Sequence, residues 1–152
     1  MIAFEKSIGV VLFRINKEKI KYLLLHYPGG HWDFPKGHCE KNENDHETLR
    51  RELNEETGIT DLKIIPGFKS QIRYFYLAKN KEKEQRKKEG KDTAIFKKVI
   101  YYLASTNTNQ VYLSAEHISF NWLNYDEASK KITYKNSRKV LIEAQRFLEE
   151  NK

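Results

Sequence analysis

The chain has 152 residues, a formal net charge of +7, 39% hydrophobic residues and 32% charged residues, which is typical of a single domain with a buried core. No run of about 18 or more apolar residues is present, so we expect no membrane span, and the N-terminus lacks the basic leader and apolar block of a signal peptide. The single cysteine, Cys39, excludes an internal disulfide, and together these features favour the cytoplasm.

The positive charge is concentrated in one segment. Residues 79–98 contain nine Lys or Arg and four Asp or Glu, a local net charge of +5 that leaves the rest of the chain only slightly basic. The first interpretation is a solvated loop, inserted at about residues 79–93. The alternative is a basic arm that lies near a polyphosphate or an RNA.

The first part of the chain predicts a β-hairpin. Two apolar runs rich in β-formers, at 7–15 and 19–27, are separated by polar residues, as in two paired strands. A short extended piece is expected at 32–34, because Pro35 disfavours helix in the residue before it.

A helix is predicted to follow, from about Asn44 to Thr57. Asn44 suits the N-cap, and Glu47, three residues later, completes a capping box. Gly58 fits the position that ends the helix. Apolar residues four apart within this segment are expected to face the core.

The rest of the chain predicts further strands and two helices. The strand-like runs are 62–70, 71–78, 94–106 and 119–124, a short helix is expected at 126–132, and an amphipathic helix is expected at 136–150. There is no internal repeat and no sign of a second domain, so residues 1–152 are interpreted as one α+β domain in which helices pack on a mixed β-sheet.

Three acids, Glu52, Glu55 and Glu56, crowd the last turns of the predicted helix. Carboxylates are disfavoured at this negative end of the helix dipole, and like charges three or four residues apart repel each other. On a helical wheel the three acids fall within roughly 100°, beside the core positions. A divalent cation accounts for the cluster, because Mg²⁺ binds through a few carboxylates together with the phosphates of a substrate.

Two neighbouring residues suit the same interpretation. Gly37, in the preceding loop, lets the backbone approach closely and can supply its carbonyl as a further ligand. Arg51 can pair with an acid of the cluster and hold it in place.

Residues 37–59 resemble the Nudix box, G-x5-E-x7-R-E-U-x-E-E-x-G-U, where U is aliphatic. Every fixed position matches, namely Gly37, Glu43, Arg51, Glu52, Leu53, Glu55, Glu56, Gly58 and Ile59. The resemblance implies a Nudix hydrolase, which has an α/β/α sandwich fold with a mixed sheet. Such an enzyme cleaves a nucleoside diphosphate linked to another group and uses Mg²⁺ or Mn²⁺.

The flanking segments narrow the resemblance. "WDFPKGH", "GFKSQIRY", "KKVIYYLA" and "LSAEHISFNWLNYDEA" are similar to segments of the asymmetrical diadenosine tetraphosphate hydrolases, which release ATP and AMP. Bacterial RNA pyrophosphohydrolases share a related pattern but typically carry Gly where this chain has His38. The basic segment departs from the pattern, since animal members have a much shorter connection there.

The resemblance implies a set of metal ligands. These are Glu52, Glu55 and Glu56 of the helix, the backbone of Gly37, and one further acid from a downstream loop, Glu116. The general base is either Glu116 or one of the helix acids. Glu43 has two open interpretations, a structural or electrostatic role at the helix start, where the dipole favours a carboxylate, or contact with the metal.

Five residues are candidates for binding the substrate. Lys36 and Lys98 are expected to bind phosphate oxygens, because phosphoryl transfer needs positioned cations. His31 is expected to contact a phosphate or to protonate the leaving group. Adenine needs a flat apolar partner, and the resemblance points to Tyr74, with Tyr125 as a second candidate.

Two other functions compete with hydrolysis of a dinucleoside polyphosphate or another nucleotide. One is RNA 5′ pyrophosphohydrolysis, in which the basic segment would grip the transcript. The other is a catalytically silent domain that binds nucleotides or RNA, for which loss of box glutamates would be expected, whereas all are present. We expect a monomer with no membrane partner.

Overall fold

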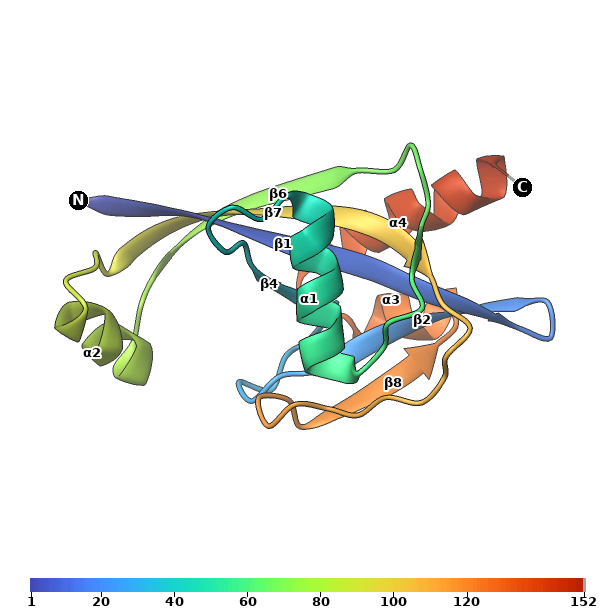
Figure 1. Ribbon diagram of the computed structural model, residues 1–152, viewed down its shortest axis with the longest axis horizontal. Coiled ribbons are helices and arrows are strands. Elements are labelled where there is room, and N and C mark those ends of the chain that lie inside the picture. Colours follow the sequence, from blue (N-terminus) through green and yellow to red (C-terminus); the bar gives the residue numbers. More distant parts are fainter. Residues whose placement is uncertain (152) are drawn as a thin grey trace.

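The computed structural model describes residues 1–151, which form a mixed sheet with helices around it (Figure 1). The strands are β1 (Ile2–Asn16), β2 (Lys19–His26), β3 (Trp32–Asp33), β4 (Lys36–His38), β5 (Lys63–Ile64), β6 (Ser70–Leu77), β7 (Ala94–Ser105) and β8 (Ser119–Leu123). The helices are α1 (Asp45–Thr57), α2 (Asn80–Lys88), α3 (Tyr125–Lys131) and α4 (Lys135–Glu150). Within residues 1–151 no helix has the length and apolar character needed to cross a membrane.

The sheet is built around β1 and β7. These two strands pair in parallel along residues 2–13 and 94–105, and the strand order is β3-β2-β1-β7-β5, with β4 on β1, β6 on β7 and β8 on β2. The other pairings are antiparallel. β1 and β2 meet at Asn16 and Lys19, which confirms the predicted hairpin.

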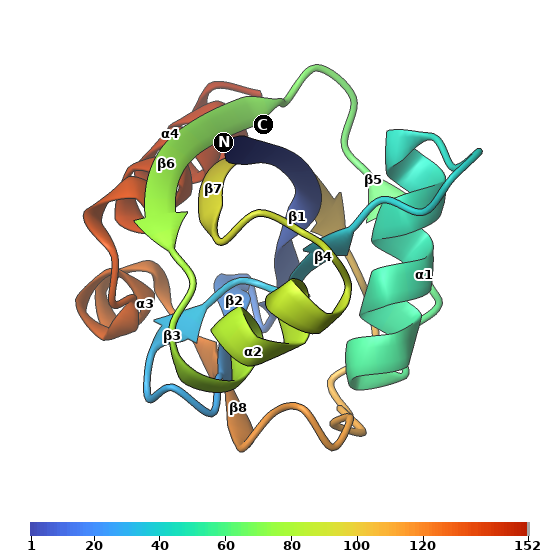
Figure 2. The ribbon, with the colours of Figure 1, turned by 90° about the vertical axis from the view of Figure 1, so that its left-hand side faces the viewer.

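Alternation along the central strands gives each face of the sheet its own core. On one face Ile8, Val10 and Leu12 of β1 pack with Leu49 and Leu53 of α1. On the other face the neighbouring residues of β1 pack with residues of α3 and α4, namely Ala128, Val140, Leu141 and Ala144. The helices therefore cover both faces, as Figure 2 shows, and the expected α/β/α sandwich with a mixed sheet is confirmed.

The segment interpreted as a solvated loop is largely exposed, but it contains the helix α2, so the expected loop conformation was wrong. Lys, Glu, Gln and Arg are good helix formers, and tertiary contacts hold this segment in place. Arg86 is only 7% exposed, and its Nη1 donates to Glu5 of β1 at 2.9 Å. The hydroxyl of Tyr76 donates to Glu82 of α2 at 3.0 Å.

Two strands also differ from the prediction. The strand expected at 62–70 ends at Ile64 in β5, because Pro66 and Gly67 follow, and Gly67 has a positive φ of 92°. The three-residue β4 was not predicted, because three residues are too few to show the alternation of a strand.

Candidate active site

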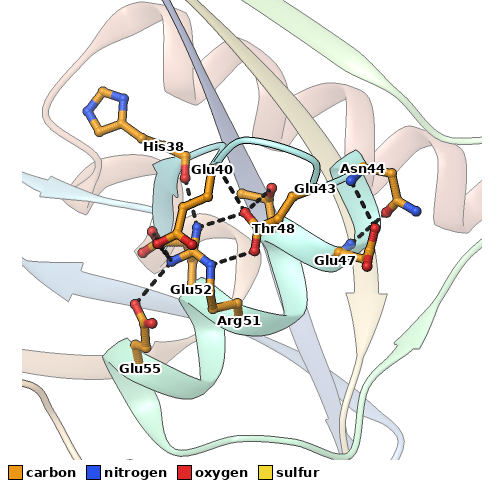
Figure 3. Close-up of polar contacts among 9 residues, drawn as sticks. All are labelled: His38, Glu40, Glu43, Asn44, Glu47, Thr48, Arg51, Glu52 and Glu55. Atoms are coloured by element: carbon orange, nitrogen blue, oxygen red, sulfur yellow. Dashed lines mark hydrogen bonds and ion pairs between the residues drawn. The ribbon is translucent and has the colours of Figure 1, made fainter.

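The helix α1 starts and stops as the sequence predicts. The side chain of Asn44 accepts from the Glu47 amide at 2.8 Å, and the Glu47 carboxylate accepts from the Asn44 amide at 3.0 Å (Figure 3). At the other end Gly58 adopts a left-handed φ of 75°, and its amide donates to the Asn54 carbonyl at 2.8 Å. These caps fix the last two turns, where the three acids lie.

Arg51 lies at the centre of a network of carboxylates (Figure 3). Its Nε and Nη2 donate to the two oxygens of Glu43 at 2.6 and 3.0 Å. Its Nη1 donates to Glu52 at 2.9 Å and to Glu55 at 3.2 Å, while Nη2 also donates to the His38 carbonyl at 2.9 Å. Arg51 therefore holds two of the acids of α1 beside the end of β4.

Glu43 is fixed in the same network. Hydrogen bonds from Arg51, the Glu40 amide and the Thr48 hydroxyl lower the pKa of Glu43 to about 2. The Thr48 hydroxyl donates at 2.9 Å and the Glu40 amide at 2.9 Å. With both oxygens engaged by Arg51, these contacts favour the structural interpretation of Glu43 over metal contact.

Glu56 is buried and incompletely paired. It is 6% exposed, and its Oε2 has no hydrogen-bond partner in the described part of the chain. Burial, followed by the charges of Glu52, Glu116 and Glu55, raises the pKa of Glu56 to about 9. A buried carboxylate without a partner is costly, so the ligand-free chain keeps Glu56 protonated at neutral pH.

Glu52 faces β4. A Cβ built on Gly37 would lie 1.9 Å from Cδ and 2.2 Å from Oε2 of Glu52. Only glycine at this position leaves room for the carboxylate against the β4 backbone. Burial and the charges of Glu55 and Glu116 raise the pKa of Glu52, although Arg51 opposes this shift.

The downstream loop brings Glu116 to the helix acids. The Ser114 amide donates to the Glu56 carbonyl at 3.2 Å, and the Glu116 amide donates to the Ser114 hydroxyl at 3.3 Å. The charge of Glu116 raises the pKa of both Glu52 and Glu56. His117, next in the chain, has Nε2 4.0 Å from Oε1 of Glu56.

The donor chemistry of this cluster fits a hard divalent cation. The unpartnered Oε2 of Glu56, the carboxylate of Glu52 and the close backbone of Gly37 are all oxygen donors, which Mg²⁺ prefers. Within residues 1–151 no group of three His, Cys, Asp or Glu side chains is arranged to hold an ion as it stands. Glu52 and Glu55 point at Arg51 instead, so metal binding requires these side chains to turn.

A cavity of about 450 Å³ opens on the face of the sheet that lies away from α1. Its lining residues are His31, Asp33, Lys36, Ile72, Tyr74, Tyr76, Tyr134, Asn136 and Ser137. Three of the five expected substrate-binding residues, His31, Lys36 and Tyr74, are therefore brought together here. The cavity combines aromatic rings with a cation, which suits a nucleotide.

Lys36 joins this cavity to the acid cluster. In β4 Lys36 pairs with Gly9 and Gly37 pairs with Ile8, so the two residues point to opposite faces of the sheet. The Lys36 ammonium lies 3.5 Å from Oδ2 of Asp33 and 5.9 Å from the ring centre of Tyr74. Burial opposes its charge, but Asp33 and Tyr74 outweigh this effect and raise the pKa of Lys36.

His31 is held among aromatic rings. It stacks on Tyr27 with ring centres 4.7 Å apart and lies 5.4 Å from the ring of Tyr134. Burial lowers the pKa of His31, against the opposing charge of Asp33. The imidazole is therefore neutral at neutral pH, and it can donate or accept a hydrogen bond.

The structure places Lys98 on the face of the sheet away from the cavity, and its contact with phosphate stays a prediction. In β7 it is Lys97 that pairs with Tyr74, while Lys98 pairs with Arg73 and so lies on the α1 face of the sheet. Burial, followed by the charge of Lys36, lowers the pKa of Lys97 to about 8. The sequence shows two adjacent lysines, and the partner strand decides which of them lies on the same side of the sheet as the cavity.

The tyrosines that line the cavity also differ from those expected from the sequence. Tyr125, at the start of α3, packs against the core cluster and does not line the cavity. Tyr134 and Tyr76 do line it, and sequence reasoning missed both. Tyr134 lies between two helices, where no periodic pattern would have found it. Tyr76 lies two residues after Tyr74 in β6, so strand alternation could have placed it on the same face.

Comparisons with known proteins agree with this geometry. The NUDIX domain model matches residues 3–144. The chain is 34% identical over 155 aligned residues to the asymmetrical bis(5′-nucleosyl)-tetraphosphatase of Mus musculus, covering 94% of this chain and 95% of that protein. The protein of the same name in Caenorhabditis elegans is 32% identical, with 94% and 96% coverage.

The solved structures give the same result. The binary complex of the C. elegans Ap4A hydrolase superposes with a TM-score of 0.78 and 30% identity, covering 96% of this chain and 98% of that one. The match of the family model along nearly the whole chain, the intact box and the shared fold lead to one conclusion. The chain belongs to the NUDIX domain family.

Proposed function

We propose that this chain hydrolyses diadenosine tetraphosphate asymmetrically, to ATP and AMP, with Mg²⁺. The observation that carries the proposal is the two-sided arrangement of β4, in which Lys36 lines the aromatic cavity while Gly37 lies against Glu52 of α1. A polyphosphate that passes this strand would meet the nucleoside cavity on one side and the acids on the other. Relatives that align along 94% of the chain carry the name of this activity.

The chain's own residues have distinct roles in this proposal. Tyr74 and Tyr134, on the cavity wall, stack on one adenine, and Lys36 and His31 bind the phosphates that follow. Lys97, whose pKa of about 8 leaves it mostly charged at neutral pH, adds a second cation on this face. A charged group that is partly withdrawn from water interacts strongly with phosphate oxygens.

Glu52, Glu55, Glu56 and Glu116, with the Gly37 carbonyl, are the residues that would hold Mg²⁺. When bound, Mg²⁺ supplies neutralisation of the phosphate charge and activation of water. In the ligand-free chain Arg51 keeps Glu52 and Glu55 beside β4, and both side chains would turn from Arg51 to hold Mg²⁺. Either Glu116 or a helix acid accepts the proton of the attacking water, and Glu56 must first give up the proton that its raised pKa retains.

A turnover assay in ¹⁸O-labelled water tests the proposal. The purified chain is incubated with Mg²⁺ and a panel of diadenosine tetraphosphate, triphosphorylated RNA, deoxynucleoside triphosphates and nucleoside diphosphate sugars. ATP and AMP from the dinucleotide, with one labelled product that identifies the attacked phosphorus, support it. An unreacted dinucleotide, with turnover of another substrate, contradicts it.

A second candidate, RNA 5′ pyrophosphohydrolysis, is favoured by one specific contact. The basic helix α2 reaches the cavity wall, since the Tyr76 hydroxyl donates to Glu82 at 3.0 Å and Tyr76 lines the cavity. In the same panel, release of pyrophosphate from triphosphorylated RNA selects this function. The cytoplasmic location and the monomeric state stay predictions from the sequence.

A further inference from the structure

The outer end of the sheet carries an aromatic row on the face that α1 covers further in. Phe4 of β1 pairs with Phe96 of β7, and Phe96 pairs with Phe75 of β6. Paired residues point to the same side of a sheet, so the three rings stand side by side across three strands. Phe4 and Phe75 are 79% and 53% exposed, and the ring centres of Phe4 and Phe96 are 5.9 Å apart.

A row of cations lies beside the aromatic row. Two residues further along each strand, roughly 7 Å away, Lys6 pairs with Lys98 and Lys98 pairs with Arg73. Lys6 forms an ion pair with Asp45 at 2.8 Å. Neither Lys98 nor Arg73 takes part in any ion pair found within residues 1–151.

This face is open, and it is separate from the active-site cavity. The next row inward, Ile8 and Ile100, lies in the core cluster under α1. The helix α2 lies on the opposite face, where Arg86 binds Glu5, and β1, β6 and β7 extend past α1 at this end (Figures 1 and 2). We refer to the two rows, Phe4, Phe75, Phe96, Lys6, Lys98 and Arg73, as the aromatic–cation face.

The cation row has an unfavourable arrangement in the isolated chain. Like charges directly opposite each other on neighbouring strands destabilise a sheet, and here three cations follow one another across three strands. Of these three cations, only Lys6 has an acidic partner among residues 1–151, namely Asp45. A second copy packed symmetrically on this face would bring two such rows together, because a two-fold interface pairs a patch with itself. A bound polyanion removes the repulsion.

We propose that the aromatic–cation face binds single-stranded nucleic acid. Exposed rings on a sheet are a platform on which successive bases stack, and adjacent cations hold the phosphates. The face presents both groups in parallel rows, with Phe4, Phe75 and Phe96 for the bases and Lys6, Lys98 and Arg73 for the backbone. Ile2 and Leu77 are also exposed at this end and extend the apolar side of the platform.

Binding is measured by fluorescence anisotropy with a uridine dodecamer RNA that carries a 5′-hydroxyl and a 3′ fluorescein. This probe has no 5′ polyphosphate, so the result does not depend on the proposed hydrolase activity. We expect saturable binding by the full chain. Phe4→Ala and Phe75→Ala should each raise Kd about 5- to 150-fold, the effect of losing one stacked base.

Matched controls come from other surfaces of the same chain. Phe120→Ala removes a phenylalanine that is 36% exposed on β8, and it should change Kd within about twofold. Arg73→Gln should reduce the slope of log affinity against log salt by about 0.7, the value for one phosphate contact on a single strand. Lys19→Gln, at the far end of the β1–β2 hairpin, should leave the slope unchanged.

Several results would overturn the proposal. These are absence of binding at low salt, loss of affinity in Phe120→Ala as large as in Phe4→Ala, or Phe4→Ala and Phe75→Ala variants that bind normally. Analytical ultracentrifugation and flotation with phosphatidylserine vesicles are run in parallel. Self-association or vesicle binding that Phe4→Ala abolishes, without RNA binding, assigns the face to another partner. Circular dichroism confirms that each variant is folded.

Discussion

The carboxylate of Glu52 occupies the space in front of Gly37 where any other residue would place its Cβ. That Cβ would lie 1.9 Å from Cδ of Glu52 and 2.4 Å from its Cγ. The first residue of the Nudix box must therefore be small so that an acid of the box helix can lie against it. This contact also explains why a glycine is needed at a position with an ordinary strand conformation, since Gly37 is absent from the residues with positive φ.

The first prediction concerns Gly37→Ala. Because the obstructing atoms belong to the flexible end of Glu52, we expect that side chain to turn away while the fold is kept. Hydrolysis of diadenosine tetraphosphate should fall about 100-fold, the scale expected when a catalytic group is displaced by about 1 Å. Steady-state kinetics measure the rate, and thermal unfolding monitors the fold.

A double-mutant cycle with Glu52→Gln tests whether the loss acts through Glu52. If it does, Gly37→Ala should cost little further activity in the Glu52→Gln background, because contacting residues are not additive. Fully additive losses would show that Gly37 acts independently of the carboxylate that it faces.

The second prediction concerns pH and Glu56. In the metal-free chain the pKa of Glu56 is raised to about 9 from an ordinary value of 4.5. The folded state therefore binds a proton that the unfolded state releases, so this contribution to stability is complete below about pH 4.5 and is lost as the pH rises toward 9. Glu56→Gln should raise Tm in EDTA at about pH 8 by at least 2–4 °C, the equivalent of about 1 kcal/mol or more.

The same variant should differ from the wild type in its response to Mg²⁺. Near pH 4 the gain in Tm should nearly disappear, because the wild-type carboxyl is then protonated in both the folded and the unfolded chain. Mg²⁺ at about pH 8 should stabilise the wild type and have much less effect on Glu56→Gln. An equal gain in Tm at both pH values would contradict the raised pKa of Glu56. Equal stabilisation of the wild type and Glu56→Gln by Mg²⁺ would contradict the role of Glu56 as a metal ligand.

Local sequence rules predicted α1 well because its signals are covalently close. The N-cap Asn44, its partner Glu47 and the terminating Gly58 lie within or beside the helix they define. The three acids follow from the same register, and the Nudix box adds their chemistry. The core and the layers could also be predicted, since alternation along β1 is long enough to show two apolar faces.

Features that depend on partner strands could not be predicted. Lys97 and Lys98 are adjacent residues of the same type, so the sequence alone does not distinguish them. Their pairing with β6 shows which face of the sheet each one occupies. The helix α2 has no apolar stripe, and its buried contact joins Arg86 to Glu5, 81 residues away. Tyr134 reaches the cavity because α4 packs back onto the sheet, which no local pattern encodes.

The third prediction uses the two adjacent lysines as a matched pair. Lys97→Gln should raise KM for diadenosine tetraphosphate about tenfold or more, the loss expected for a hydrogen bond to a charged group. Lys98→Gln, on the other face, should have a much smaller effect. Because the pKa of Lys97 is lowered to about 8, wild-type KM should rise as the pH passes about 8, and Lys97→Gln should not show this rise.

A pH series of KM for the wild type and both variants measures this difference. A larger effect for Lys98→Gln than for Lys97→Gln would show that the strand register does not determine phosphate binding. A wild-type KM that stays flat through about pH 8 would exclude the Lys97 ammonium as the titrating group.

The fourth prediction compares two tyrosines. Tyr134 lines the cavity and is 49% exposed, so Tyr134→Ala should raise KM about 5- to 150-fold through loss of stacking on adenine. Tyr125 packs against the core, so Tyr125→Ala should lower Tm and leave KM nearly unchanged. Kinetics and thermal unfolding of both variants separate the two roles, and a Tyr134→Ala variant with unchanged KM would remove that ring from the nucleotide site.

The fifth prediction concerns the anchoring of α2. Arg86 donates from Nη1 to Glu5 at 2.9 Å and from Nε to the Asp92 carbonyl, and it is the buried residue of a helix that is otherwise exposed. Arg86→Ala should therefore loosen α2 without unfolding the sheet, because α2 contributes no residue to the two core clusters. Amide hydrogen exchange in residues 80–88 should accelerate about tenfold or more, while exchange in β7 stays slow.

Loosening α2 should also affect substrate binding in the cavity. Tyr76 lines the cavity and its hydroxyl donates to Glu82 of α2 at 3.0 Å, so Arg86→Ala should raise KM as well as the exchange rate. Lys87→Ala, an exposed neighbour on the same helix, controls for loss of one positive charge. Arg86→Lys keeps the charge but lacks the planar donor fork, so it should restore little of the protection. If exchange in 80–88 is the same in Arg86→Ala as in the wild type, the ion pair with Glu5 does not hold the helix, and the segment behaves as the solvated insert that its composition first indicates.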